Sequence, residues 1–159
     1  MKTFRIPVFI DEFDMDELPE DIQRLKKEAE KAREKAYAPY SDFKVGAAVL
    51  LDDGTVISAN NQENAAFPSG MCAERVAVWY AGAQHPGRKI LKIFITARSE
   101  KHRLDKPVPP CGACRQSIAE YEVKQNREIE IWFMGETGKI WRSPSLKNLL
   151  PLIFDGSDL

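Results

Sequence analysis

The stretches PPCGACR at residues 109–115 and MCAER at residues 71–75 decide how this chain is interpreted. Each places a cysteine where a helix is predicted to begin. Free backbone N–H groups and the positive end of the helix dipole favour a thiolate over a thiol at such a position. Cys111 and Cys114 are three residues apart and share one side of a helical turn, so both can bind one ion. We predict that Cys72 joins them as a third metal ligand.

The number of cysteines distinguishes a catalytic metal from a structural one. The chain has three, and a zinc ion held by three side chains keeps its fourth tetrahedral position for water, whereas a structural zinc has four protein ligands. Glu74 lies two residues after Cys72, close enough to move a proton of that water. The two histidines, His85 and His102, lie in polar, turn-like segments that are usually solvated surface. We therefore expect a catalytic zinc site with Glu74 as its acid and base.

Simpler interpretations of the same residues exist. A C-x-x-C pair can be a redox pair, and a lone cysteine is more often a small buried hydrophobic residue than a ligand. A redox pair, however, offers no role for Cys72 and Glu74. Glu74 alone could be a first-turn glutamate favoured by the helix dipole, but its position beside Cys72 favours catalysis.

Three thiolates around Zn²⁺ leave a net negative charge, which weakens the metal as a Lewis acid. Arg75 follows Glu74 and Arg115 follows Cys114, so either guanidinium could donate hydrogen bonds to the sulfurs and draw charge off the metal. We expect Arg75 to contribute more.

Length and charge exclude several classes of protein. The 159 residues suit one domain, and 23 Lys and Arg against 24 Asp and Glu give no net positive field for a polynucleotide. The longest apolar stretch, residues 45–51, is too short to cross a membrane. Free thiols suit a reducing compartment. We expect a cytoplasmic protein with neither a nucleic acid nor a membrane as partner.

Apolar periodicity predicts alternating helices and strands. Apolar residues recur at spacings of three and four over residues 18–37, which predicts an amphipathic helix ended by Ala38-Pro39. Runs rich in β-formers at 43–51 and 55–60 flank a glycine turn and predict a hairpin. Further helices are expected at 71–83, 111–121 and 145–150, and further strands at 90–97, 128–134 and 139–142. This order predicts an α/β fold, a three-layer α/β/α arrangement with a mixed β-sheet.

The combination of C-A-E-R with P-C-G-A-C-R-Q resembles the cytidine deaminase family, in its short-chain, homotetrameric type. Residues 40–48 resemble its first-strand segment, 61–65 its nucleoside-binding N-x-E-N-A stretch, and 149–154 its C-terminal end. The resemblance begins near Glu28. It implies a hydrolase that converts cytidine and/or deoxycytidine to uridine or deoxyuridine plus ammonia through a zinc-activated water, in pyrimidine salvage.

The same resemblance implies the substrate-binding residues. Phe43 would pack against the pyrimidine, while Asn61 and Glu63 would hydrogen-bond a ribose hydroxyl. Phe154 is similar to the C-terminal phenylalanine that completes a neighbouring subunit's pocket in tetrameric members, so a homotetramer is implied. Without the resemblance, Phe43 would be assigned to the core, and Asn61 and Glu63 to the loop surface.

By the same resemblance, residues 14–159 form a single zinc-dependent deaminase domain. Residues 1–13 lie outside it and are expected to be an N-terminal arm, or an edge strand, since Pro7 removes a ladder donor. Phe67 departs from the tyrosine of many members, and residues 99–108 form a charged loop without an assigned role.

Other functions stay open at this stage. Deaminases of the antibiotic blasticidin S share the zinc segments, and a non-catalytic zinc-binding module is a second alternative. The preference between cytidine and deoxycytidine is also open, because a contact to the 3′-hydroxyl reads both sugars alike.

Overall fold

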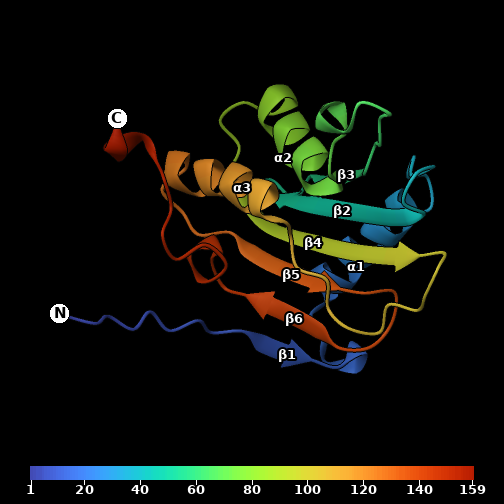
Figure 1. Cartoon of the computed structure of the whole chain (residues 1–159), viewed down its shortest axis with the longest axis horizontal. Coiled ribbons are helices and arrows are strands. Elements are labelled where there is room, and N and C mark those ends of the chain that lie inside the picture. Colours follow the sequence, from blue (N-terminus) through green and yellow to red (C-terminus); the bar gives the residue numbers. More distant parts are fainter.

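One six-stranded mixed sheet lies at the centre of the protein, as the computed structural model of residues 1–159 shows (Figure 1). Its strand order is β1-β6-β5-β4-β2-β3. The strands are β1 (Asp11–Phe13), β2 (Phe43–Leu51), β3 (Val56–Asn60), β4 (Ile90–Ser99), β5 (Glu130–Met134) and β6 (Ile140–Ser143). The three α-helices are α1 (Glu20–Arg33), α2 (Ala73–Gln84) and α3 (Gly112–Lys124). Only β4 and β5 pair in parallel, and α3 makes the crossover connection between them that parallel strands require.

Helices cover both faces of the sheet because its central strands are apolar on both sides. Successive strand residues point to opposite faces: on β4, Phe94 packs with residues of α1, whereas Ile93 and Ile95 pack with residues of α2 and α3. Figure 1 shows α2 and α3 in front of the sheet and α1 behind it. The predicted three-layer α/β/α fold with a mixed sheet is confirmed. None of the helices is long and apolar enough to cross a membrane.

Two predicted helices are shorter in the structure. The first ends at Arg33 rather than at residue 37, because Tyr37 leaves the helix to bridge Gln62 and donates its N–H to the carbonyl of Asn61 at 3.1 Å. The helix expected at 145–150 is a single 3₁₀ turn, Leu146–Asn148, capped by the side chain of Ser145. In the first case contacts with a distant segment replace the last helical turn.

The N-terminal arm contains a short strand at its end. Residues 11–13 form β1, an edge strand antiparallel to β6. Asp11 forms an ion pair with Arg142 at 2.6 Å, and the ring of Phe13 lies 4.9 Å from that of Trp132. Residues 1–10 are extended and lie outside any strand, and they run past the end of β6 (Figure 1). Phe4 and Ile6, the apolar residues just before Pro7, therefore do not join the sheet.

A glycine in β2 lets the first helix approach the sheet. A Cβ atom at Gly46 would lie 1.9 Å from the carbonyl oxygen of Ala29 in α1 and 2.7 Å from the nitrogen of Arg33. Real Cβ atoms do not come this close to other heavy atoms, so only glycine fits. This close contact holds α1 against β2, on the face of the sheet opposite α2 and α3 (Figure 1).

Candidate active site

Two helix N-termini bring the three cysteines together. Cys72 is the N-cap residue of α2, Cys111 is the N-cap residue of α3, and Cys114 lies in the first turn of α3. The sulfurs of Cys111 and Cys114 are 3.5 Å apart, those of Cys72 and Cys111 are 3.9 Å apart, and all three lie within 4.8 Å of one another. A tetrahedron with Zn–S bonds of ~2.3 Å has S–S edges of ~3.8 Å. The cluster therefore fits a single zinc ion held by three thiolates.

The surroundings of Cys72 favour its thiolate form. The pKa of Cys72 falls to about 5 because the Cys114 thiol donates a hydrogen bond to it and the Arg75 guanidinium and the Cys111 thiol stabilise the negative charge further. Arg75 Nη2 lies 3.6 Å from the Cys72 sulfur, and the guanidinium stacks over the ring of Trp79. The same hydrogen bond raises the pKa of Arg75.

Arg115 does not share this role. Its Nε donates to the carbonyl of Pro110 at 2.8 Å and its Nη1 donates to the carbonyl of Leu149 at 2.8 Å, so the guanidinium bonds backbone rather than sulfur. One residue along a helix turns a side chain by about 100°, which directs Arg115 away from the sulfur cluster that Cys114 joins. Arg115 instead links Pro110, the residue before Cys111, to Leu149 in the C-terminal segment.

Glu74 lies in the first turn of α2 and is 5 % exposed. Burial raises the pKa of its carboxyl group, and the charge of the nearby Cys72 thiolate raises it further. A raised pKa makes a carboxyl group a better proton acceptor, which a general acid–base catalyst requires.

A cavity of about 680 Å³ opens onto Glu74, Cys72 and Cys111. This volume is typical of small-molecule sites. Phe43, Asn61 and Glu63 also line the cavity, so three of the four predicted substrate-binding residues come together beside the sulfurs. Tyr40 and Phe67 line it as well, with ring centroids 6.0 Å apart.

Phe154, the fourth predicted residue, lies elsewhere. Its side chain is 60 % exposed and does not line the cavity of its own chain. Its carbonyl accepts a hydrogen bond of 2.8 Å from the side chain of Gln116 in α3. The C-terminal segment is thus fixed to α3 with the phenylalanine pointing into solvent.

Glu63 is held by the turn that precedes β2. One carboxylate oxygen accepts the backbone N–H groups of Tyr40 at 2.9 Å and Ser41 at 3.3 Å, and the other accepts the Ser41 hydroxyl. Burial raises the pKa of Glu63, but these hydrogen bonds outweigh that effect and the pKa is lowered. A carboxylate offers about four acceptor positions. Three of them are used by Tyr40 and Ser41, so Glu63 keeps one for a ligand.

Asn61 directly follows β3, and its side-chain amide bonds to the backbone of β2. Its Oδ1 accepts the N–H of Val45 at 2.7 Å and its Nδ2 donates to the carbonyl of Phe43 at 2.9 Å, which fixes the first residues of β2. One N–H of the amide is left for a ligand. Asn61 thereby orients Phe43 at the cavity wall.

Ser41 was not among the predicted site residues. Its hydroxyl donates to Glu63 and accepts the N–H of Phe43 at 3.1 Å, so it connects the carboxylate to the aromatic residue. A serine that accepts the N–H two residues on is a local turn motif. The Ser-x-Phe spacing was the available signal.

Residues 19–127 match the family model of the cytidine and deoxycytidylate deaminase zinc-binding region. The chain belongs to this family. Among its relatives, the cytidine deaminase of Halalkalibacterium halodurans is 50 % identical over 140 residues, which cover 87 % of this chain and 98 % of the relative. The crystal structure of cytidine deaminase from Burkholderia pseudomallei superposes with a TM-score of 0.72 at 38 % identity, over 83 % of this chain and 98 % of the other. The blasticidin-S deaminase of Bacillus cereus is 35 % identical over 129 residues, which are 77 % of this chain and 86 % of that protein.

Proposed function

We propose that this protein is a zinc-dependent hydrolase that deaminates cytidine and/or deoxycytidine to uridine or deoxyuridine plus ammonia, as in pyrimidine salvage. One observation carries the proposal: three sulfurs lie within 4.8 Å of one another, and two of them, those of Cys72 and Cys111, line a cavity together with Glu74, which is 5 % exposed. Membership of the deaminase family gives this geometry its chemistry.

Cys72, Cys111 and Cys114 would hold the zinc ion, which when bound supplies the Lewis acidity that makes water a nucleophile near neutral pH. Glu74 takes up the proton of the attacking water and delivers it to N3 of the pyrimidine. It then takes the proton of the newly formed C4 hydroxyl and passes it to the amine, so that the C4–N bond breaks, ammonia leaves and a C4 carbonyl remains. Because Glu74 is buried, bulk water does not compete for these transfers.

The cavity residues supply recognition of the nucleoside. Phe43 packs against the flat base, while the free N–H of Asn61 and the free acceptor position of Glu63 hydrogen-bond the 3′-hydroxyl of the sugar. Both groups are oriented beforehand by backbone hydrogen bonds, so little order is lost when the nucleoside binds.

The assembly we propose is a homotetramer in which Phe154 of one subunit closes the cavity of a neighbour. The 60 % exposure of Phe154 and its fixed backbone support this role. Residues 14–159 would form the catalytic domain, with the arm of residues 1–13 covering a subunit interface. Three free thiols at the site suit the reducing cytoplasm.

A single assay separates this proposal from its alternatives. The purified protein is analysed for zinc and incubated with cytidine, deoxycytidine and blasticidin S, and the products are resolved by chromatography. We expect about one zinc ion per chain and ammonia release from the nucleosides. Turnover of blasticidin S alone would identify an antibiotic deaminase. This alternative is tested because the similar protein from Bacillus cereus is a blasticidin-S deaminase. Stoichiometric zinc without any turnover would identify a non-catalytic zinc module.

A further inference from the structure

The charged loop of residues 99–108 lies between β4 and α3. It is anchored at Leu104 and Asp105. The carbonyl of Leu104 accepts the N–H groups of Glu136 at 2.8 Å and Thr137 at 3.2 Å. A Cβ atom at Gly138 would lie 2.3 Å from the carbonyl oxygen of Asp105, so the turn after β5 and the loop are in close contact. This part of the loop therefore has a defined position relative to the sheet.

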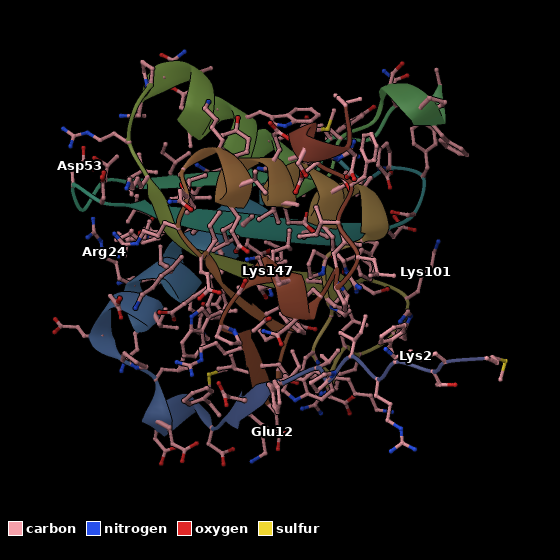
Figure 2. All side chains as sticks on the ribbon, turned by 90° about the vertical axis from the view of Figure 1, so that its left-hand side faces the viewer. Lys2, Glu12, Arg24, Asp53, Lys101 and Lys147 are labelled. Atoms are coloured by element: carbon pink, nitrogen blue, oxygen red, sulfur yellow. The ribbon has the colours of Figure 1, made fainter.

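The near end of the loop holds the turn before β2. Lys101 Nζ donates to the carbonyl of Ser41 at 3.1 Å and lies 3.4 Å from a carboxylate oxygen of Asp42. The N–H of Glu100 donates to the carbonyl of Asp42 at 3.0 Å. In Figure 2, Lys101 extends from its loop toward the segment that leads into β2.

Asp42 is the residue of this turn that most needs outside support. Its φ is 57°, in the left-handed region that residues other than glycine rarely adopt. Ser41, immediately before it, provides two of the three hydrogen bonds that hold Glu63. The position of the Glu63 carboxylate therefore depends on a turn that Lys101 contacts at two atoms.

We propose that Lys101 is a positioning residue for sugar recognition: it fixes the turn at Ser41 and Asp42, and through that turn it directs the free acceptor position of Glu63 at the 3′-hydroxyl of the nucleoside. The inference rests on the proposed function, because it uses the sugar contact of Glu63. Lys101 does not touch the substrate and has no part in the proton transfers at Glu74.

The test compares Lys101→Met with Lys106→Met in the zinc-loaded protein. Lys106 lies in the same loop and forms no side-chain hydrogen bond or ion pair, so its substitution removes the same charge without touching the turn. For each variant, kcat and KM are measured for deoxycytidine by chromatography. The inhibition constant of 2′,3′-dideoxycytidine, which lacks the 3′-hydroxyl, is measured as a competitor.

We expect Lys101→Met to raise KM for deoxycytidine roughly three- to fivefold, as suits a partly exposed charged contact, and to leave kcat and the inhibition constant of the dideoxy compound unchanged. Lys101→Arg should restore KM, and Lys106→Met should leave it as in the wild type. In a Glu63→Gln background, Lys101→Met should have no further effect on KM.

An equal rise in KM and in the inhibition constant would overturn the inference, since the effect would then be independent of the 3′-hydroxyl. The proposed function fails separately, if the zinc-loaded wild type releases no ammonia from either nucleoside.

Discussion

Replacing Glu74 by glutamine tests the centre of the proposed chemistry. Glutamine has nearly the same size and keeps hydrogen-bonding capacity, but it cannot carry a proton between water and the pyrimidine. Glu74 is 5 % exposed, so solvent has little access to substitute for it. A positioned acid–base group contributes ~10²- to 10⁴-fold to the rate, which corresponds to ~2.7–5.4 kcal/mol in the barrier. We expect kcat to fall by this factor.

The zinc site and the fold should survive the substitution. Glu74 is not one of the three sulfur ligands, and burial disfavours its charged form, so the neutral amide removes an unfavourable desolvation term. Zinc content by mass spectrometry is therefore expected to match the wild type, and the midpoint of thermal unfolding is expected not to fall.

The matched control is Glu63→Gln, which removes the same charge from the same cavity. Because Glu63 is assigned to the sugar, this variant should raise KM for deoxycytidine much more than it lowers kcat. A well-folded Glu74→Gln protein that carries one zinc ion and keeps kcat within about tenfold of wild type would refute the acid–base assignment.

Three further outcomes are expected. Arg75→Ala should weaken zinc binding ~10- to 100-fold in competition with a chelator and lower turnover, because Arg75 donates to the Cys72 sulfur at 3.6 Å; full zinc affinity together with full turnover would remove the role. Gly46→Ala should lower the free energy of unfolding by about 3 kcal/mol in denaturant titration, since the new Cβ would meet the Ala29 carbonyl oxygen at 1.9 Å; a midpoint equal to the wild type would contradict the packing argument. Deleting residues 1–10 while keeping β1 should reduce the number of chains per particle, as determined by light scattering. An unchanged number of chains and an unchanged melting temperature would show that the arm covers no interface.

Local spacing made the zinc cluster predictable. Cys111 and Cys114 share a helical turn whatever the rest of the fold does, and Glu74 follows Cys72 so closely that the two must be neighbours. The cysteines of the two segments are 39 residues apart in sequence, however, and their convergence depends on how α2 and α3 pack on the sheet. The number of cysteines and the position of Glu74 linked the two segments in advance, and the family resemblance supported that link.

The orientation of side chains was less predictable. Arg75 and Arg115 both follow site residues, yet one bonds a sulfur and the other bonds two backbone carbonyls. Phe154 does not line the cavity of its own chain, and its place in the cavity of a neighbouring subunit stays a prediction. Such differences arise because a side chain's partner belongs to another segment, whose position the local sequence does not specify.

By itself the sequence determined the periodic features of this protein. These are the main helices and strands, the apolar character of both faces of the central sheet, and the positions of the cysteines at helix N-termini. These follow from backbone geometry over a few residues, which every chain obeys. Tertiary structure alone decided the early end of α1, the addition of β1 to the sheet and the contacts that run from Lys101 through Ser41 to Glu63. Each of these joins segments far apart in the chain, and such contacts depend on strand order and packing.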